Sequence, residues 1–211
     1  MIDVYDNVLE EHNAILIDDE VKKISWTYGY HLGLEASWHS SCGNNKEECN
    51  EAGYSWANDL FDLFMNKFDF KKKYSIDGYN RIHCNAHTNG LGLPIHVDDG
   101  DFTMIYYPRL DWKTEWGGGT AIFEELTTLD KTPDRKKEWE NLQIDKHVNY
   151  KGNRLVVFDA YLPHQAQPVS RECYELRTAV VFKTSVSSAN RERLDFYKNA
   201  IEQGNYKIKF A

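Results

Sequence analysis

The sequence predicts one mainly β domain with flanking helices, arranged as a sandwich or barrel. From about Tyr79 onward, short runs of β-branched and aromatic residues are separated by turn residues, and a helical stripe precedes them. Many short strands after early helices are typical of a sandwich or barrel that helices brace. No repeat, low-complexity tract or linker divides the 211 residues, and this length is sufficient for one buried core.

We therefore predict a single domain over residues 1–211. Its core covers about 79–183, a helical or mixed region covers 1–78, and a final helix covers about 187–202. Ser55 is a candidate N-cap for a helix in the early region. The apolar stripe that predicts this helix recurs at intervals of four, at Trp56, Leu60, Phe64 and Phe68.

Five short runs predict the strands of the core. They are Asn80 to Ala86, Phe102 to Tyr107, Thr120 to Phe123, Leu155 to Phe158 and Leu176 to Phe182. Between Glu124 and Asn149 lies a charged stretch that is long for a hairpin connection. We favour a surface excursion for this stretch, with a lid over the site as the alternative.

Composition and charge limit the classes of partner and location. The net charge of -8 opposes attraction to phosphate backbones, so a nucleic acid is a poor candidate. No apolar run approaches the roughly 20 residues that span a bilayer, and the acidic start of the chain is unlike a secretory or mitochondrial address. The four cysteines form no C-x-x-C pair, which favours a reduced compartment over a local Cys42–Cys49 bridge. We expect a cytoplasmic protein, and the sequence does not determine its oligomeric state.

Spacing selects three metal-ligand candidates among the histidines and acids. His96 and Asp98 are two positions apart, which places both side chains on one face of an extended strand. Asp99 would face the other way and fits a turn. His164 follows a strand-like run through a short bend and supplies a third ligand. Two histidines and one carboxylate form a facial triad that suits Fe(II), because three coordination positions stay open.

Arg177 lies thirteen positions after His164 on a predicted strand with apolar neighbours. Its guanidinium needs an anion there, either a core carboxylate or the distal carboxylate of a bound ligand. Tyr107 is the second candidate for that carboxylate, because a phenol inside a barrel needs a hydrogen-bond partner. In an earlier predicted strand, either His83 or Asn85 is a candidate to line the site. The favoured alternative is that they are polar residues near a barrel mouth whose hydrogen bonds are satisfied within the protein.

The order and spacing of these residues resemble the 2-oxoglutarate/Fe(II) dioxygenase superfamily. The segments similar to its prolyl 4-hydroxylase-like branch are His96 to Asp99, Ile105 to Tyr107, Gly118 to Phe123, Asn153 to Asp159 and His164 to Val169. The similarity extends from about Arg81 to Lys183, which is about half of the chain. The N-terminal third contains no matching motif.

The resemblance implies a double-stranded β-helix, the jelly-roll of cupin-like proteins, with helices on one face. It implies iron on His96, Asp98 and His164, and the C5 carboxylate of 2-oxoglutarate on Arg177 and Tyr107. We add Asn85 as a further cofactor-binding candidate.

The implied activity is hydroxylation of an unactivated C–H bond, coupled to oxidative decarboxylation of 2-oxoglutarate by O2. Ascorbate is a further candidate cofactor. The implied substrate is a prolyl side chain in a peptide or protein, or an amino-acid-like small molecule.

One departure concerns the carboxylate anchor. The gap from His164 to Arg177 is a few residues longer than in the hypoxia-type prolyl hydroxylases, so Arg171 is a rival anchor, although it lies in a turn. Two functions from other classes compete with the oxygenase: a jelly-roll zinc hydrolase and a non-catalytic, cupin-like metal-binding protein. The zinc reading leaves Arg177 and Tyr107 unexplained.

Overall fold

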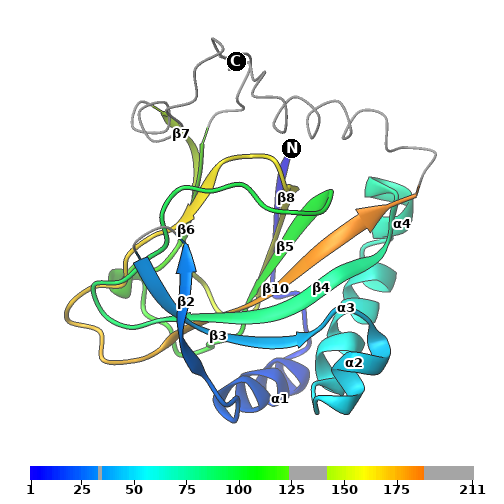
Figure 1. The fold of residues 1–211 in the computed structure, drawn as a ribbon, viewed down its shortest axis with the longest axis horizontal. Helices are drawn as coiled ribbons and strands as arrows, with labels where there is room; N and C mark the ends of the chain where they lie inside the picture. Colours follow the sequence, from blue (N-terminus) through cyan, green and yellow to red (C-terminus); the bar gives the residue numbers. More distant parts are fainter. Residues whose placement is uncertain (33–34, 124–141, 188–211) are drawn as a thin grey trace.

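The computed structural model describes residues 1–32, 35–123 and 142–187, which form two antiparallel sheets with helices against the larger one (Figure 1). The larger sheet has seven strands in the order β1-β8-β5-β10-β4-β3-β2, and the smaller has three in the order β7-β6-β9. The strands of the larger sheet are β1 (Ile2–Asp6), β2 (Thr27–Leu32), β3 (Glu35–Gly43), β4 (Ile76–His87), β5 (Phe102–Tyr107), β8 (Arg154–Asp159) and β10 (Arg177–Val186). The smaller sheet contains β6 (Thr120–Phe123), β7 (Ile144–Val148) and β9 (His164–Ala166).

The helices that the structure describes lie mostly in the first third of the chain. They are α1 (Glu11–Lys22), α2 (Lys46–Glu51), α3 (Ser55–Lys67), α4 (Phe70–Tyr74) and the 3-10 turn η1 (Thr114–Trp116). None of them is long and apolar enough to cross a membrane. The predicted mainly β class with flanking helices is confirmed.

The helix predicted from the four-residue stripe is α3, but its N-cap differs from the prediction. Ser55 is the first helical residue, and Tyr54 occupies the N-cap without a side-chain cap bond. The stripe packs as expected: the ring of Phe64 lies 5.5 Å from that of Tyr106 and 6.1 Å from that of Phe182, centroid to centroid. The helix therefore covers the outer face of the larger sheet.

Alternation along β5 separates two cores. Met104 and Tyr106 point outward, into a core shared with the helices. Ile105 and Tyr107 point inward, into a second core between the two sheets. Successive strand residues face opposite sides, so this division follows from the sequence. The inner face is where the predicted site residues lie.

The five predicted strands are present, with shifted ends, and the structure adds others. The strands β1, β2 and β3 belong to the larger sheet, although we predicted only a helical or mixed region over 1–78. The strand β7 falls inside the stretch 124–149 that we predicted as an excursion. β1 is recognisable only through its partner, since Ile2 pairs with Phe158 at the far end of the sequence.

Two sequence predictions fall outside the described residues. They are the greater part of the charged stretch, 124–141, and almost all of the final helix, 188–202. Those elements and the single-domain boundary stay predictions.

Candidate functional site

The three predicted metal ligands meet between the two sheets, with His164 on β9 and with His96 and Asp98 on the segment before β5. Ligand atoms of His96, Asp98 and His164 all lie within 4.8 Å of one another. His96 Nε2 is 3.6 Å from Asp98 Oδ1, and His164 Nε2 is 3.2 Å from Asp98 Oδ2. Ligand atoms about 2.1 Å from an octahedral ion lie about 3 Å from their neighbours, so these three groups fit around one ion with small adjustments.

The backbone brings the two histidines together in a way that differs from the prediction. The segment with His96 and Asp98 lies outside the named strands, and His96 forms an isolated antiparallel bridge with His164. His96 N donates to His164 O at 3.0 Å, and His164 N donates to His96 O at 2.8 Å. Asp98 N donates to Ala160 O at 2.8 Å. The two ligand-bearing segments are therefore fixed directly to each other.

Each histidine is held in the tautomer that a metal needs. His96 Nδ1 lies 2.9 Å from Pro94 O, and His164 Nδ1 lies 2.9 Å from Leu162 O. A carbonyl oxygen only accepts, so each Nδ1 carries the hydrogen and each Nε2 has a free lone pair. Both lone pairs are on the nitrogens nearest Asp98.

Charges in the site match the ligand forms. Burial, and then the nearby His164, lowers the pKa of His96 to about 4, so the ring is neutral near pH 7. Burial alone would raise the pKa of Asp98, but Lys183 and then His164 hold it well below its ordinary value. Two neutral imidazoles and one carboxylate are the donor set that suits Fe(II) with open positions.

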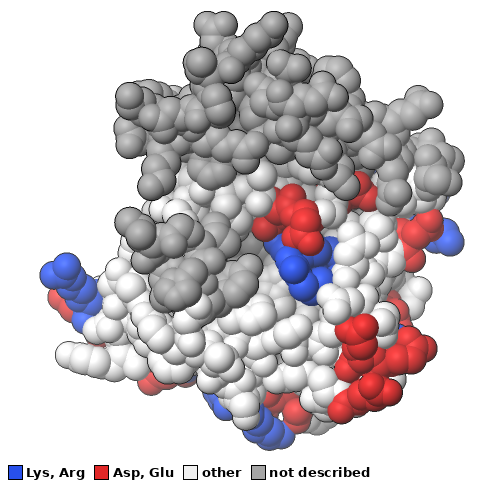
Figure 2. Space-filling model, in the orientation of Figure 1, with Lys and Arg blue, Asp and Glu red and all other residues white. Residues whose placement is uncertain are grey.

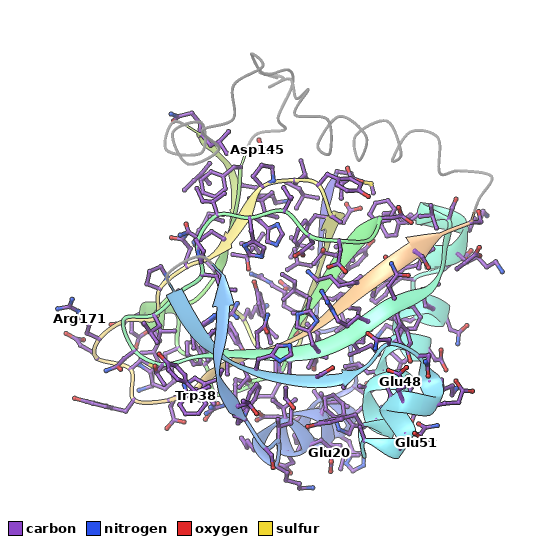
Figure 3. All side chains as sticks on the ribbon, in the orientation of Figure 1. Glu20, Trp38, Glu48, Glu51, Asp145 and Arg171 are labelled. Carbon is purple, nitrogen blue, oxygen red and sulfur yellow. The ribbon has the colours of Figure 1, made fainter. Side chains whose placement is uncertain are left out.

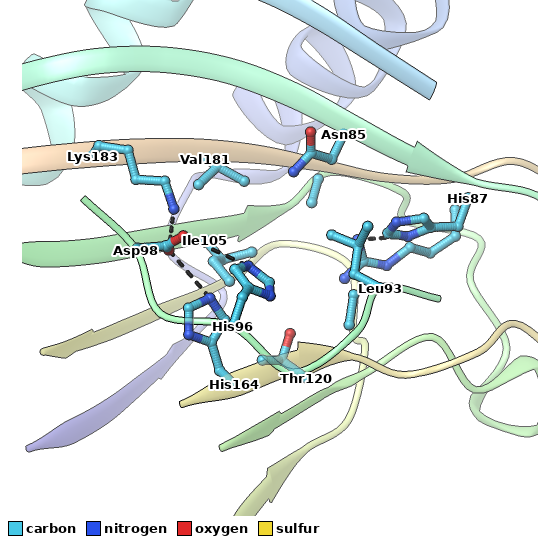
Figure 4. Close-up of a pocket in the computed structure, with 13 residues that line it drawn as sticks. Asn85, His87, Leu93, His96, Asp98, Ile105, Thr120, His164, Val181 and Lys183 are labelled. Atoms are coloured by element: carbon cyan, nitrogen blue, oxygen red, sulfur yellow. Dashed lines mark hydrogen bonds and ion pairs between the residues drawn. The ribbon is translucent and has the colours of Figure 1, made fainter. Parts of the chain in front are cut away.

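Two donors hold one oxygen of Asp98, and sequence reasoning missed both. Thr103 Oγ1 donates to Asp98 Oδ2 at 2.6 Å. Lys183 Nζ forms an ion pair with the same oxygen (Figure 4). Asp98 Oδ1, which neither of them contacts, faces His96 Nε2. The available signal was strand alternation, because Lys183 lies six residues after Arg177 on one face of the same strand.

Arg177 is buried beside the same cavity, with only 2% of its surface exposed. Its Nε donates to Gly118 O at 2.9 Å, and its Nη1 lies 3.5 Å from His87 Nδ1. Within ranges 1–32, 35–123 and 142–187, no carboxylate pairs with it. A buried guanidinium without a carboxylate partner favours an anionic ligand.

Gly118 allows Arg177 to lie where it does. The backbone of Gly118 has a φ of +72°, and a Cβ there would be 3.0 Å from Arg177 Cγ. A larger residue would be strained in its backbone and would crowd the Arg177 side chain. Gly118 therefore has a structural role next to Arg177.

Tyr107 lies beneath Arg177 and does not itself line the cavity. The guanidinium carbon is 5.5 Å from the centroid of the Tyr107 ring. The Tyr107 hydroxyl is 2.7 Å from Thr120 Oγ1, and Thr120 lines the cavity. Burial raises the pKa of Tyr107, which keeps it a phenol. The structure thus places Tyr107 next to the anchor.

Asn85 and His87 line the cavity from β4. From the sequence, Asn85 is a candidate and His87 has no predicted role. Strand alternation from Asn85 places the His87 side chain on the same face.

The cavity volume is about 40 Å³, below the roughly 300 Å³ typical of small-molecule sites. Side chains such as Lys183 would have to move when a ligand enters.

The rival anchor Arg171 lies away from the cavity. It is exposed in a turn at the edge of the molecule, which argues against it as the anchor (Figure 3). Trp112 is buried, and its indole Nε1 donates to Gly117 O at 3.0 Å. Its role is packing.

The four cysteines are free thiols, so no Cys42–Cys49 bridge is present. Cys42 Sγ instead lies 3.8 Å from Cys84 Sγ, inside the core.

Burial of His87 predicts a pH dependence of stability. Burial, and then Arg177, lowers its pKa from 6.5 to about 3. Below pH 6.5 the unfolded chain binds a proton that the folded chain does not, so the free energy of unfolding falls as the pH falls from 6.5 to about 3. One such group contributes up to about 1.4 kcal/mol per pH unit.

We expect urea unfolding between about pH 6.5 and 4 to show a shallower pH slope for His87→Gln than for the wild type. The exposed His147 offers the matched control, and His147→Gln should keep the wild-type slope. Equal slopes for His87→Gln and the wild type would contradict the prediction.

Comparisons with known proteins agree with this geometry. The sequence profile of the 2OG-Fe(II) oxygenase superfamily matches residues 77–183, just over half of the chain. No curated protein sequence matches the chain. Many solved structures share its fold.

Three of them illustrate the likeness. A prolyl-4-hydroxylase from Pseudomonas putida matches with a TM-score of 0.60 and 13% identity, covering 88% of this chain and 92% of that one. A prolyl hydroxylase from Trichoplax adhaerens, in complex with a hypoxia inducible factor peptide fragment, matches with a TM-score of 0.56 and 16% identity over 87% and 82%. The alpha ketoglutarate dependent epimerase SnoN, from nogalamycin biosynthesis, matches with a TM-score of 0.59 and 12% identity, covering 92% of this chain and 81% of that one.

These identities are low, so the structural matches establish the fold, and the predicted jelly-roll with its prolyl 4-hydroxylase-like resemblance is confirmed. The profile establishes the family, because it spans the whole segment from the start of β4 to Lys183, including the candidate ligands and Arg177. The chain belongs to the 2OG-Fe(II) oxygenase superfamily.

Proposed function

We propose that this protein is a 2-oxoglutarate- and Fe(II)-dependent dioxygenase that hydroxylates an unactivated C–H bond. The observation that carries the proposal is a single cavity lined both by the triad and by a buried arginine. A zinc hydrolase would use the triad but would leave Arg177 with no function. An oxygenase uses both.

Three residues would hold the ion and one would hold the cosubstrate. His96 and His164 would bind Fe(II) through Nε2, and Asp98 would bind it through Oδ1, while Thr103 and Lys183 retain Oδ2. Arg177 would bind the C5 carboxylate of 2-oxoglutarate. When bound, Fe(II) and 2-oxoglutarate supply the oxidation: one atom of O2 enters succinate as CO2 leaves, and the other enters the C–H bond as a hydroxyl.

The chain itself contributes orientation and a dry environment. Apolar side chains of Leu93, Ile105 and Val181 line the cavity along with the ligands. They lower the local dielectric constant, which strengthens the attraction between Arg177 and a carboxylate. Tyr107 supports the Arg177 guanidinium from below and fixes the Thr120 hydroxyl.

For the substrate, we propose a prolyl residue of a peptide or an amino-acid-like small molecule. The resemblance to prolyl hydroxylases supports the first, and the small size of the cavity at the triad is compatible with either. The same fold also serves an epimerase, so the reaction outcome must be measured. Peptide and amino-acid panels compared for succinate release would separate the two substrate classes.

The test of the proposed function starts with the wild-type protein and needs no substrate. We expect a visible charge-transfer band when Fe(II) and then 2-oxoglutarate are added without O2. On admission of O2 and substrate, succinate should form and one atom of labelled O2 should appear in the product. Absence of the band would exclude the cosubstrate site, and metal-dependent hydrolysis without O2 would favour a zinc hydrolase. A band without succinate for any substrate would favour a binding protein.

A further inference from the structure

We propose that the substrate carries a carboxylate, which Lys183 and Arg81 bind on the side of the candidate ligands away from Arg177. The inference rests on the proposed function and specifies its substrate class. It begins from two cations other than Arg177: Lys183, which also contacts the candidate ligand Asp98, and Arg81, whose partner is Asp99.

Lys183 and Arg81 lie directly opposite each other on neighbouring strands, β10 and β4. Their positions share the inner face with Val181 and Asn85, which line the cavity. Like charges in such a cross-strand pair repel each other. An anion between them would remove that repulsion.

Lys183 is nearly fully buried, with 4% of its surface exposed, and its partner is Asp98. Asp98 is also the only carboxylate among the candidate ligands. The charges of Fe(II), Asp98, 2-oxoglutarate and Arg177 cancel one another. The ammonium of Lys183 is then a buried positive charge next to a divalent ion, and such a charge needs a further anion.

The two cations are well placed to serve the substrate rather than the cosubstrate. Six residues of extended strand separate Lys183 from Arg177, which is roughly 20 Å along β10. The cosubstrate carboxylate is assigned to Arg177, at the far end of that strand segment. Lys183 contacts Asp98 from the opposite side, so it borders the part of the site that the cosubstrate leaves open.

The wall between these positions is polar where a core would be apolar. Every inward residue of β4 from position 81 to 87 is polar: Arg81, His83, Asn85 and His87. Arg81 Nε, His83 Nδ1 and Asn85 Oδ1 are buried without a hydrogen-bond partner among the described residues. Buried polar atoms usually find partners. A bound polar ligand would supply them.

The subsite has access to solvent through Arg81. The Arg81 side chain is 36% exposed, and its Nη2 donates to Asp99 Oδ1 at 2.8 Å. Asp99 is 63% exposed, so this ion pair is at the surface and breaking it costs little free energy. Figure 2 shows a group of Lys and Arg atoms near the middle of the face in view, with Asp and Glu atoms against it. An incoming carboxylate could replace Asp99 on Arg81.

Neighbouring groups favour an anion over a cation. Burial, and then the charges of Lys183 and Arg81, lowers the pKa of His83 well below its ordinary value, so its ring is neutral and adds no competing charge. The planar guanidinium of Arg81 matches a carboxylate in geometry. A cationic substrate would meet two positive charges here.

The test compares N-acetylated amino acids with their primary amides, in which an uncharged NH2 group replaces one oxygen of the negatively charged carboxylate. N-acetylproline, N-acetylleucine and N-acetylphenylalanine, each as acid and as amide, are titrated calorimetrically into the anaerobic protein with Fe(II) and saturating 2-oxoglutarate. Saturation keeps Arg177 occupied. We expect at least one acid to bind about tenfold or more tighter than its amide, which is about 1.4 kcal/mol.

Lys183→Gln should reduce the acid-to-amide preference to near one. Arg81→Gln, which leaves the contact between Lys183 and Asp98 intact, should weaken the preference and guards against loss of folding or metal in the first variant. Lys151→Gln removes an exposed lysine that pairs with Asp6, far from the cavity, and should keep the wild-type preference.

Three results would overturn the inference: equal binding of acid and amide, no binding of any acid, or a preference that survives in both Lys183→Gln and Arg81→Gln. Tighter binding of inorganic phosphate than of every acid would replace the carboxylate by a phosphate group and would also overturn it. The wild-type charge-transfer band decides the proposed function separately. A band with no acid preference removes only this inference.

Discussion

His164→Ala should abolish the charge-transfer band and lower succinate formation by on the order of 100-fold or more. Changes to residues that merely orient a metal ligand already cost about 10- to 100-fold in affinity or activity, and this change removes a ligand. The loss should be severe because the imidazole Nε2 of His164 lies 3.2 Å from Asp98 Oδ2, among the other candidate ligands. The backbone of His164 pairs with that of His96, and this pairing survives the substitution, so the fold should be kept.

Anaerobic titration with Fe(II), followed by calorimetry or by the band itself, measures the effect on metal binding. His147→Ala is the matched control, because His147 is an exposed histidine of β7. Wild-type metal affinity in His164→Ala would show that the ion does not bind at the triad. Circular dichroism should give the same spectrum for both variants.

Arg177→Met should raise the dissociation constant of 2-oxoglutarate by about 10- to 100-fold, with little effect on Fe(II) affinity. Hydrogen bonds to charged groups contribute about 1.5–3 kcal/mol, which corresponds to this range. Met fills much of the space of Arg177 but offers no charge to a carboxylate. The measurement is a 2-oxoglutarate titration of the anaerobic Fe(II) protein.

Arg171→Met is both the control for this experiment and the test of the rival anchor. Arg171 is exposed, so we expect its replacement to leave 2-oxoglutarate affinity unchanged. If Arg171→Met weakens binding and Arg177→Met does not, the assignment of the anchor is wrong. If neither does, the cosubstrate carboxylate is bound elsewhere.

The sequence by itself determined the residues whose chemistry has few alternatives. The spacing of His96 and Asp98, the later His164, and Arg177 on an apolar strand were visible because each is a polar group where the local pattern is extended or apolar. The structure brings the first three within 4.8 Å and places Arg177 at their cavity. The division of β5 into two faces also followed from alternation alone.

Only the tertiary structure decided which residues support these groups. Strand alternation places the side chains of Lys183 and His87 on the inner face, but their roles and that of Thr103 depend on what lies opposite them: Asp98 for Lys183 and Thr103, and Arg177 for His87. The strand β3 was missed because its polar residues give no apolar alternation, and β1 because its partner β8 lies at the other end of the chain. Local periodicity reports burial of one face, whereas strand pairing and charge partnership are long-range contacts that a single sequence does not display.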